Sequence, residues 1–460
     1  MSRTTRIPVL AALAALTLIT LAAPRAWALD IKRMQLANGA VLLVSEQHQL
    51  PMVSMAIAFD AGSRRDPVGQ EGIAALTASA MQQGTQQMGV GEFNQKVDFM
   101  GSAIDVSASR DFAIAAFTSL KKYQADTLHL LAETLQNPGL RNADIERKRL
   151  ETIADIRSNE EEPGYTAGVA FAKMIFGDSP YGHQTEGSVE SLGKLTPDQV
   201  RAFYHTYYKF GSAVIAVTGD VDADAIKASL DKEFSGLAGT VPAQAVPPAQ
   251  AVAPGIHTNL INRNVAQANL MLGGGGIARD NPDYYKIEVM NYILGGGGFS
   301  SRLMKVVRSK AGLAYTIDSG FQAGKFPGAF VIELQTKNAS ANQSLKLILE
   351  QMREIQNAPV SDAELIAAKK YLIGSFPLKL DRQSEILGFM LQTEIYGLGL
   401  DYAARYPKII AAVTKADVQQ VARDYLHPNA IDIVAVANQG EAKIDVASFE
   451  AQKSASTATH

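Results

Sequence analysis

The chain has 460 residues, no cysteine and a formal net charge of −3, with 47% hydrophobic and 19% charged residues. This composition is that of an ordinary globular protein, and the slightly acidic balance makes nucleic acid and anionic membrane poor partners. The lack of cysteine excludes disulfides and thiolate zinc sites.

The first 28 residues predict a secretory signal peptide. Arg3 and Arg6 precede an uncharged run from Val9 to Ala23, and Ala26-Trp27-Ala28 supplies an A-x-A cleavage site. No later segment has about 18 uncharged apolar residues, so we expect no membrane anchor in the mature chain. An uncleaved anchor is the alternative. The mature chain of about 430 residues, beginning near Leu29, is long enough for two or three domains.

Hydrophobic patterning predicts a mixture of helices and strands in the first half of the mature chain. The alternating apolar segment from Met52 to Phe59 reads as a strand, which a turn at Ala61-Gly62-Ser63 joins to a helix over Gly72–Thr85. The other helices are expected near residues 90–100, 122–136, 142–160, 165–176 and 197–208. The strands are expected near residues 41–46, 52–60, 103–108, 111–118 and 213–219.

A stretch rich in proline and alanine, residues 239–255, predicts a semi-extended linker. It separates an N-terminal domain, residues 29–238, from a C-terminal domain, residues 256–440. The second domain repeats the mixture of elements, with strands expected near residues 266–272, 313–321 and 328–335 among long helices. Serine, threonine, alanine and lysine dominate residues 441–460, which we expect to form a flexible tail.

The two halves resemble each other. The segment that starts at Leu195 matches the segment that starts at Val413 at a constant offset of 218 residues, and in each a threonine N-cap opens a helix that a strand follows. Earlier in each half, the segments that start at Asn142 and Ser361 both read as capped helix starts with a carboxylate in the first turn. Either pair of similar segments alone fits many folds. Both in the same order predict duplication of one α+β unit, with helices packed on one face of a largely antiparallel sheet.

The segment from Leu294 to Phe321 is the most informative part of the second half. It begins with four consecutive glycines, which are expected to break regular structure and to let another backbone approach closely: Gly295, Gly296, Gly297 and Gly298. Ser300 or Ser301 can then cap a short helix that ends at Gly312.

The helix over Gly72–Thr85 resembles the active-site helix of the insulinase/pitrilysin family of zinc peptidases, the inverzincins, which reads G-x-A-H-x-x-E-H. In that family the two histidines bind zinc and the glutamate polarises the attacking water. The corresponding positions here are Ala75, Ala78 and Ser79, and the position of the third ligand falls on Asp155. One carboxylate does not make a zinc site, so the resemblance implies a helix emptied of its metal. The helix alone fits an ordinary amphipathic helix equally well.

Arg308, in the last turn of the predicted short helix, and Tyr315, at the start of the next strand, match a second signature of the family. Two-domain members carry a glycine-rich turn, S-S-R-L, an arginine and, seven residues later, a tyrosine in a G-L-A-Y setting. The resemblance implies that both side chains donate hydrogen bonds to the substrate beside the bond being cut. Without it, the two residues are ordinary choices for a helix end and a strand.

The resemblance implies an α+β fold of two homologous domains that form a clam-like half-chamber. It also implies a non-catalytic subunit of a heteromeric zinc peptidase, with no metal on this chain and zinc in an H-x-x-E-H-bearing partner. An extended peptide is the expected substrate, added as a strand to a sheet edge. With the signal peptide, it implies export to the periplasm. The alternatives are a peptide-binding or scaffold protein without a catalytic partner, and a stand-alone hydrolase using Ser79, which has no histidine nearby in sequence to activate it.

Overall fold

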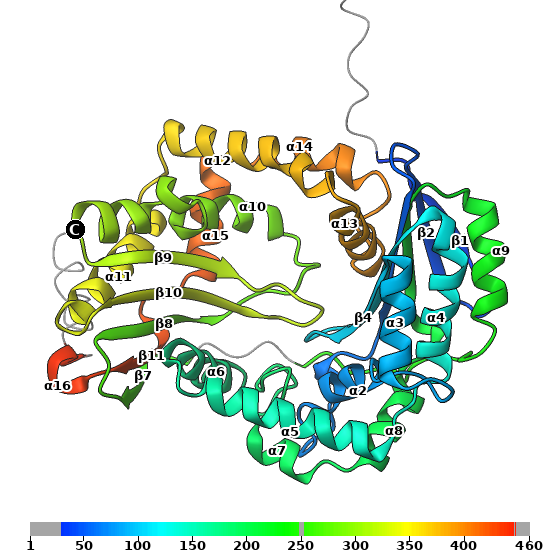
Figure 1. The fold of residues 1–460 in the computed structure, drawn as a ribbon. Coiled ribbons are helices and arrows are strands. Elements are labelled where there is room, and N and C mark those ends of the chain that lie inside the picture. The colour runs from blue at the N-terminus through cyan, green and yellow to red at the C-terminus, as the bar shows by residue number, and fades with distance from the viewer. Residues whose placement is uncertain (1–28, 248–252, 446, 448–460) are drawn as a thin grey trace, which may run out of the picture.

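A computed structural model describes residues 29–247, 253–445 and 447. Its two sheets lie on either side of a central space, and helices surround them (Figure 1). The signal peptide predicted at residues 1–28 and most of the tail predicted at residues 441–460 lie outside the described ranges. Within those ranges, no helix is long and apolar enough to cross a membrane.

The first sheet has six strands in the order β1-β2-β6-β3-β5-β4. β2 and β6 run parallel, and every other neighbouring pair is antiparallel. The sequence predicted every strand to within two residues except β1, whose residues KRMQ show no apolar alternation. The bounds are β1 (Lys32–Gln35), β2 (Val41–Glu46), β3 (Met52–Phe59), β4 (Ala103–Ala108), β5 (Ala113–Leu120) and β6 (Val214–Gly219).

Helices of the first half cover one face of this sheet with a continuous apolar core. The helix predicted from Gly72 ends early, at Met81, because Gly84 takes a left-handed φ of 91° and turns the chain. The predicted cap at Asn142 is wrong, since Arg141 precedes the helix and no side chain caps it. The bounds are α2 (Ile73–Met81), α3 (Val90–Met100), α4 (Gln124–Gln136), α5 (Asn142–Asn159), α6 (Pro163–Phe176), α7 (Val189–Lys194), α8 (Pro197–Tyr207) and α9 (Ala223–Glu233).

The second sheet repeats five of the six strands of the first. Its order is β7-β11-β8-β10-β9, with β7 and β11 parallel and the other pairs antiparallel, as for β2-β6-β3-β5-β4. The predicted duplication is therefore confirmed. β1 has no counterpart among the described strands of this sheet. The bounds are β7 (Gly255–Asn262), β8 (Gln267–Gly275), β9 (Ala314–Phe321), β10 (Ala329–Lys337) and β11 (Ala430–Ala437).

The helices of the second half follow the same plan. Ser361 and Thr414 accept hydrogen bonds from the backbone three residues on, as the sequence predicted. Residues 441 and 442, predicted to belong to a flexible tail, form part of a short helix because Ala442 is buried in the core. The bounds are α10 (Tyr284–Asn291), α11 (Ala341–Asn357), α12 (Asp362–Ser375), α13 (Gln383–Ile395), α14 (Tyr402–Ala412), α15 (Lys415–Tyr425) and α16 (Gln439–Ala442).

The two halves exchange a helix, so the prediction that helices pack on only one face of each sheet is wrong. α6 of the first half packs Phe171 against Val434 and Val436 of the second sheet. α13 of the second half packs Leu387 against Ala216 of the first sheet. β11 reads AIDIVAVA, a run apolar on both faces, which is typical of a strand covered on both sides.

Two hairpins, one from each sheet, meet at the base of the space between the halves. Asp111, in the β4–β5 hairpin, accepts hydrogen bonds from the Lys325 N–H at 2.8 Å and from the Tyr181 hydroxyl. The same hydroxyl accepts from the Phe326 N–H at 3.1 Å, in the β9–β10 hairpin. Arg64 packs over the Phe326 ring at 5.4 Å. This cluster fixes the position of one half against the other.

Candidate functional site

The positions predicted as the emptied zinc site lie on α2 and α5 and carry no ligands. Ala75 and Ser79 are half-buried, Ala78 is buried, and Asp155 is exposed on α5. A methyl group cannot coordinate a metal, and a single carboxylate is too few protein ligands for zinc. Among the described residues, no group of three or more histidine, cysteine or acidic side chains could hold a metal ion. The residues present therefore do not fit zinc.

β4 is an edge of the first sheet and lies beside α2. The Ser109 N–H bonds across to the β5 side of the hairpin, so Ile104, Val106 and Ala108 direct their backbone groups away from β5. Gln82, just after α2, donates its side-chain N–H to the outward carbonyl of Val106 at 2.7 Å. A strand edge thus runs past the emptied helix.

Arg308 and Tyr315 lie together, and Phe299 joins them. The guanidinium carbon of Arg308 lies 5.4 Å from the centre of the Tyr315 ring and 4.6 Å from the centre of the Phe299 ring. Tyr315 is 79% exposed and Phe299 is 70% exposed. Sequence reasoning missed Phe299, although an aromatic residue directly after four glycines was a usable signal. We call these three residues the arginine–aromatic cluster.

The chain before Tyr315 coils as predicted, but in a wider form than an α-helix. Met304–Lys310 form a π-helical segment, η6, and the Ser301 hydroxyl accepts from the Met304 N–H at 3.3 Å. Gly312, with a left-handed φ of 65°, ends the coil. π-Helical turns are rare and frequent at functional sites.

The glycine run behaves partly as predicted. Gly295 and Gly296 close a π-helical turn, η4 (Tyr292–Gly296), so the prediction that the run breaks regular structure is wrong for these two. This π-helical turn continues directly from α10 and includes both glycines. The predicted close approach is confirmed, because a Cβ at Gly295 would collide with Ser319 of β9. The glycine therefore brings β9, which carries Tyr315, against this turn.

A bidentate ion pair ties this segment to α12. Arg302 donates to the Glu364 carboxylate at 2.7 and 3.1 Å, and the same carboxylate accepts from the Ser361 N–H at 2.9 Å. Partial burial raises the pKa of Glu364, but the hydrogen bonds from Arg302 and Ser361 outweigh it and lower this pKa to about 2. The ionised form of Glu364 thus helps to hold the start of η6.

We expect this carboxylate to make the stability of the protein sensitive to acid. Its pKa is lower in the folded chain than the unfolded value of about 4.3, so its contribution is complete above that value and falls as the pH drops towards 2. Glu364→Gln should flatten the decrease in the free energy of unfolding between about pH 5 and pH 3, measured by urea unfolding. Glu161→Gln, at an exposed position, is the control. Equal pH slopes in wild type and Glu364→Gln would contradict this assignment.

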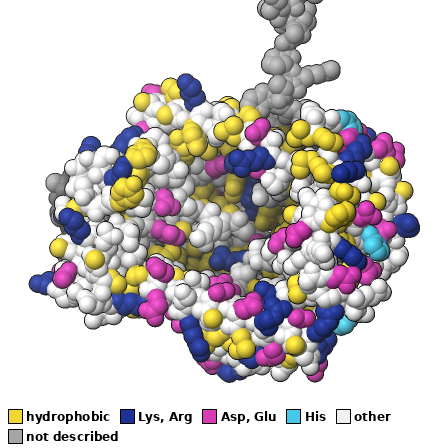
Figure 2. Space-filling view, in the orientation of Figure 1, with side chains coloured by type: hydrophobic (Ala, Val, Ile, Leu, Met, Phe, Trp, Pro, Cys, Tyr) yellow, Lys and Arg dark blue, Asp and Glu magenta, His cyan; other side chains and the backbone are white. Residues whose placement is uncertain are grey.

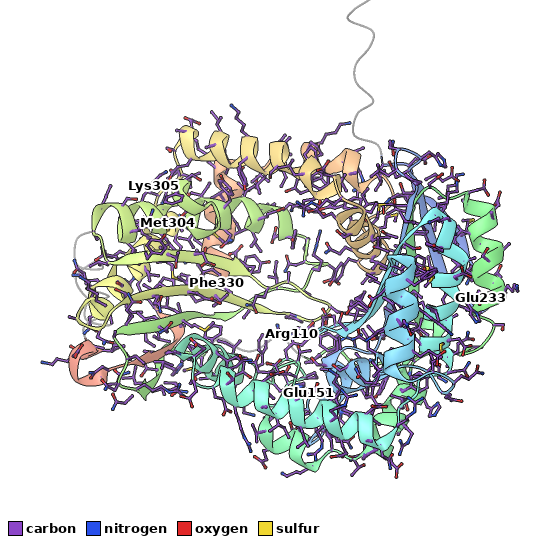
Figure 3. The ribbon with its side chains drawn as sticks, viewed as in Figure 1. Arg110, Glu151, Glu233, Met304, Lys305 and Phe330 are labelled. Carbon is purple, nitrogen blue, oxygen red and sulfur yellow. The ribbon has the colours of Figure 1, made fainter. Side chains whose placement is uncertain are left out.

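The structure does not bring the two predicted sets of residues together. Met304 and Lys305, at the start of η6, lie in the second half, far from Glu151 on α5 in the first half, whereas Arg110 lies near the middle (Figure 3). Figure 2 shows a hollow between the halves, with apolar side chains along it. An apolar cavity of about 480 Å³ lies between β5 and α13, lined by residues such as Ile114, Leu387 and Tyr396.

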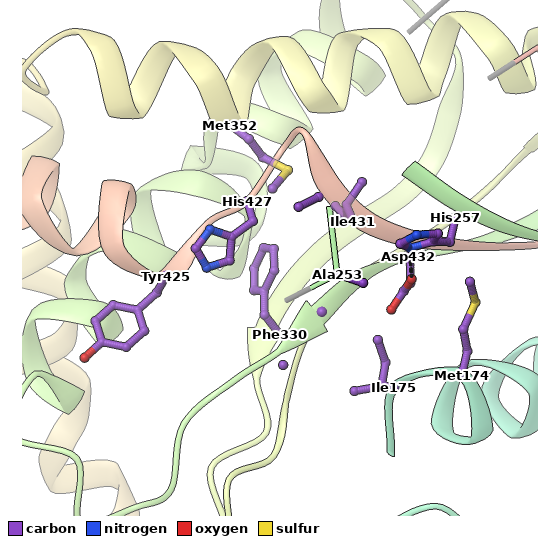
Figure 4. A pocket seen from close by; sticks show the side chains of 14 residues that line it. Met174, Ile175, Ala253, His257, Phe330, Met352, Tyr425, His427, Ile431 and Asp432 are labelled. Atoms are coloured by element: carbon purple, nitrogen blue, oxygen red, sulfur yellow. Dashed lines mark hydrogen bonds and ion pairs between the residues drawn. The ribbon is translucent and has the colours of Figure 1, made fainter. Parts of the chain in front are cut away.

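A separate pocket of about 370 Å³ lies where β8 ends and β11 begins (Figure 4). His257 of β7 and Asp432 of the neighbouring strand β11 pair at 3.1 Å in its wall, and His427 lines the same pocket. Burial raises the pKa of Asp432, while the His257 hydrogen bond lowers it. No sequence pattern indicated this pocket, because its residues come from six separate segments.

Comparison with known proteins decides the family. Residues 41–186 match the family described as Insulinase (Peptidase family M16), and residues 194–372 match the Peptidase M16 inactive domain. The crystal structure of a peptidase M16 inactive domain from Pseudomonas fluorescens is 30% identical, covers 89% of this chain and 98% of its own, and superposes with a TM-score of 0.83. The chain belongs to the insulinase-like peptidase family M16.

Other M16 proteins match over most of their length. The non-peptidase homolog YmxG of Helicobacter pylori is 25% identical and covers 87% of this chain and 93% of its own. An uncharacterized zinc protease of Streptomyces coelicolor is 25% identical, with 86% and 87% covered. A chain of Complex III2 from Candida albicans, 16% identical with a TM-score of 0.76 and 91% of this chain covered, shares the fold. Because α2 has no metal-coordinating side chains, this M16 chain is a non-catalytic protein with a peptidase fold.

Proposed function

We propose that this M16 chain is the substrate-binding subunit of an exported, heteromeric zinc peptidase. It completes the active site of an H-x-x-E-H-bearing partner in trans. The observation that carries the proposal is the arginine–aromatic cluster, which is assembled and exposed although α2 carries no metal ligands. Zinc then belongs to the partner, and export follows from the signal peptide predicted at residues 1–28.

The chemistry of the cluster supports this role. Two rings lie against the guanidinium group of Arg308, which limits its motion and leaves its N–H groups free to donate to a ligand. Donors that are aimed at a carbonyl oxygen stabilise the charge that develops on it during attack by zinc-bound water. Large exposed rings at one place are typical of a surface that a ligand or partner covers.

The substrate is an extended peptide that adds to the edge of β4 and replaces the Gln82 side chain at the Val106 carbonyl. This edge lies beside the emptied helix, and an antiparallel strand there can hydrogen-bond the outward groups of Ile104 and Ala108. The apolar cavity between β5 and α13 offers space for apolar side chains of a bound peptide. Main-chain hydrogen bonds then give affinity with little sequence preference.

Peptide cleavage by the mature chain, alone and mixed with an H-x-x-E-H paralogue from the same organism in the presence of zinc, tests the proposal. We expect cleavage by the mixture only. A mixture in which the paralogue carries glutamine in place of the glutamate of H-x-x-E-H should not cleave the peptide. Cleavage by the chain alone, lost in Ser79→Ala, would replace the proposal with a stand-alone hydrolase. A paralogue that is equally active alone would also overturn it.

A peptide-binding or scaffold protein without a catalytic partner is the second candidate. The names of two matches favour it, since one is a non-peptidase homolog and the other is a chain of Complex III2. Under this alternative the mature chain binds extended peptides, but no mixture cleaves them, and substitution of Arg308 or Tyr315 has no effect on activity.

A further inference from the structure

Among the described residues, one edge of the second sheet lacks a strand that the first sheet has. In the first sheet, β1 covers the outer edge of β2 and runs antiparallel to it, from Lys32 opposite Val44 to Gln35 opposite Val41. β7 is the counterpart of β2, and no described strand pairs with its outer edge. Within the part of the chain that the structure describes, the duplication thus leaves one strand position vacant.

A groove marks this vacant position. In the first half, Ile31 packs with the apolar side chains of α13, and Arg33 binds Glu394 of α13 at 2.8 and 3.0 Å. In the second half, the helix that corresponds to α13 is α6. A cavity of about 660 Å³ lies between α6 and β7, lined by residues such as Val169 and Ile261. The groove therefore lies where the residues of β1 lie in the other half.

β7 also lacks the features that protect an exposed strand edge. Edge strands are commonly kept from pairing by charges, proline, short length or bulges. β1 has only four residues and carries Lys32 and Arg33, the β4 edge is capped by Gln82, and β9 carries Asp318 and pairs with a register shift. β7 reads GIHTNLIN, eight residues without proline, lysine, arginine or acid. Its Leu260 is 40% exposed.

The backbone of β7 is arranged to accept another strand. The Arg263 N–H, just beyond β7, bonds the Ala437 carbonyl, so alternate residues back along the strand face β11. In a parallel pair the residues between them direct both backbone groups away from the neighbour. Four residues of β7 thus face outward: Ile256, Thr258, Leu260 and Asn262.

We infer that β7 is an interface through which two copies of this chain pair, antiparallel, about a two-fold axis. The second sheet then continues from one copy into the other. A two-fold axis produces an antiparallel pair, the direction that β1 takes on β2. Pairing about Thr258 places Ile256 opposite Leu260 of the second copy in both directions, so the apolar residues meet and no like charges do.

The charges beside the groove are complementary in this arrangement. Arg263 donates to the Glu160 carbonyl at 2.7 Å, so the start of α6 lies at the end of β7, while Met174 and His257 share a pocket at the other end. α6 therefore runs antiparallel to β7, and the two-fold axis sets α6 against its copy in opposite directions. The acidic residues Glu160–Glu162 of one copy then approach Lys173 of the other.

This interface is independent of the proposed peptidase site. β7 and β9 are the opposite edges of one sheet, and β9 carries Tyr315. Pairing at β7 therefore leaves the arginine–aromatic cluster uncovered.

The absence of cysteine makes the test direct. Thr258→Cys in the mature chain places a thiol on the two-fold axis, and mild oxidation should give a disulfide-linked dimer on a non-reducing gel. Leu150→Cys, at an exposed position on α5, is the control and should stay monomeric. Equal cross-linking of both variants, or none at Thr258→Cys, would overturn the interface.

A second variant tests the strand edge itself. The wild type should sediment as a dimer that dissociates on dilution, and Thr258→Pro should sediment as a monomer with the melting temperature of the wild type diluted to monomer. The Thr258 N–H faces outward, so proline removes no bond to β11. A wild type that stays monomeric at all concentrations, a Thr258→Pro variant that stays dimeric, or a β7 edge found occupied by a strand of another protein would each contradict the proposal.

Discussion

Arg308→Ala is expected to lower peptide hydrolysis by the mixture of this chain and the proposed H-x-x-E-H partner about 100-fold. The loss of one donor to the developing oxyanion usually costs a factor of this order. The effect should appear in kcat more than in KM, because the interaction strengthens in the transition state. Tyr315→Phe, which removes only the hydroxyl donor, should lower kcat in the same way. Steady-state kinetics with a fluorogenic peptide measure both.

Three further variants make this result specific. Lys305→Ala removes an exposed charge from the same coil, η6, and should leave hydrolysis unchanged. Arg308→Lys keeps the charge without the planar fork and should recover only part of the activity. Phe299→Ala should lower activity a few-fold, since a cation–π contact of this kind contributes about 0.5–1 kcal/mol. Equal losses in Lys305→Ala and Arg308→Ala would show a general effect of charge.

Asp60→Ala is expected to lower the free energy of unfolding by about 3–5 kcal/mol, the usual cost of removing one partner from a buried ion pair. The Asp60 carboxylate binds both Arg64 and Arg65, and the side chain of Arg64 is only 1% exposed. Without Asp60, two buried guanidinium groups lose this carboxylate, although Asp111 remains 3.6 Å from Arg64. Urea unfolding of the mature chain at neutral pH measures the change.

A surface pair provides the comparison. Glu92 and Lys96 form an exposed pair one turn apart on α3 at 3.1 Å. Glu92→Ala should change the free energy of unfolding by less than about 1 kcal/mol. The same small value for Asp60→Ala would mean that water reaches the buried cluster. The position of this cluster between the halves predicts that Asp60→Ala also loosens the relative placement of the two sheets.

Local patterns in the sequence were enough to predict most elements. Alternation marked β3, and the capped helix starts at Thr196 and Thr414 marked both halves. The spacing of Arg308 and Tyr315 correctly placed one at a helix end and the other at a strand start, which the structure brings within contact. The chemistry of the cluster still required the resemblance, since neither residue is unusual in its element.

The missed features depend on contacts between distant segments. β1 and β7 lack a clear apolar alternation, and each is defined by the strand beside it rather than by its own residues. The exchanged helices α6 and α13 were placed correctly along the chain, but amphipathic patterns do not say which sheet a helix covers. Phe299 contacts Arg308 only because the coil η6, which carries Arg308, turns the chain back towards it.

The helix exchange bears on how the fused chain arose. A single unit, before duplication, would leave one face of its sheet bare unless a second copy supplied the missing helix. The present molecule has the form of a domain-swapped homodimer whose two protomers have been joined by the residues of the linker. Joining them made the exchange intramolecular, so that assembly no longer depends on concentration, and it freed each protomer to diverge on its own. One half now carries the arginine–aromatic cluster, and the other carries the helix without metal ligands, α2.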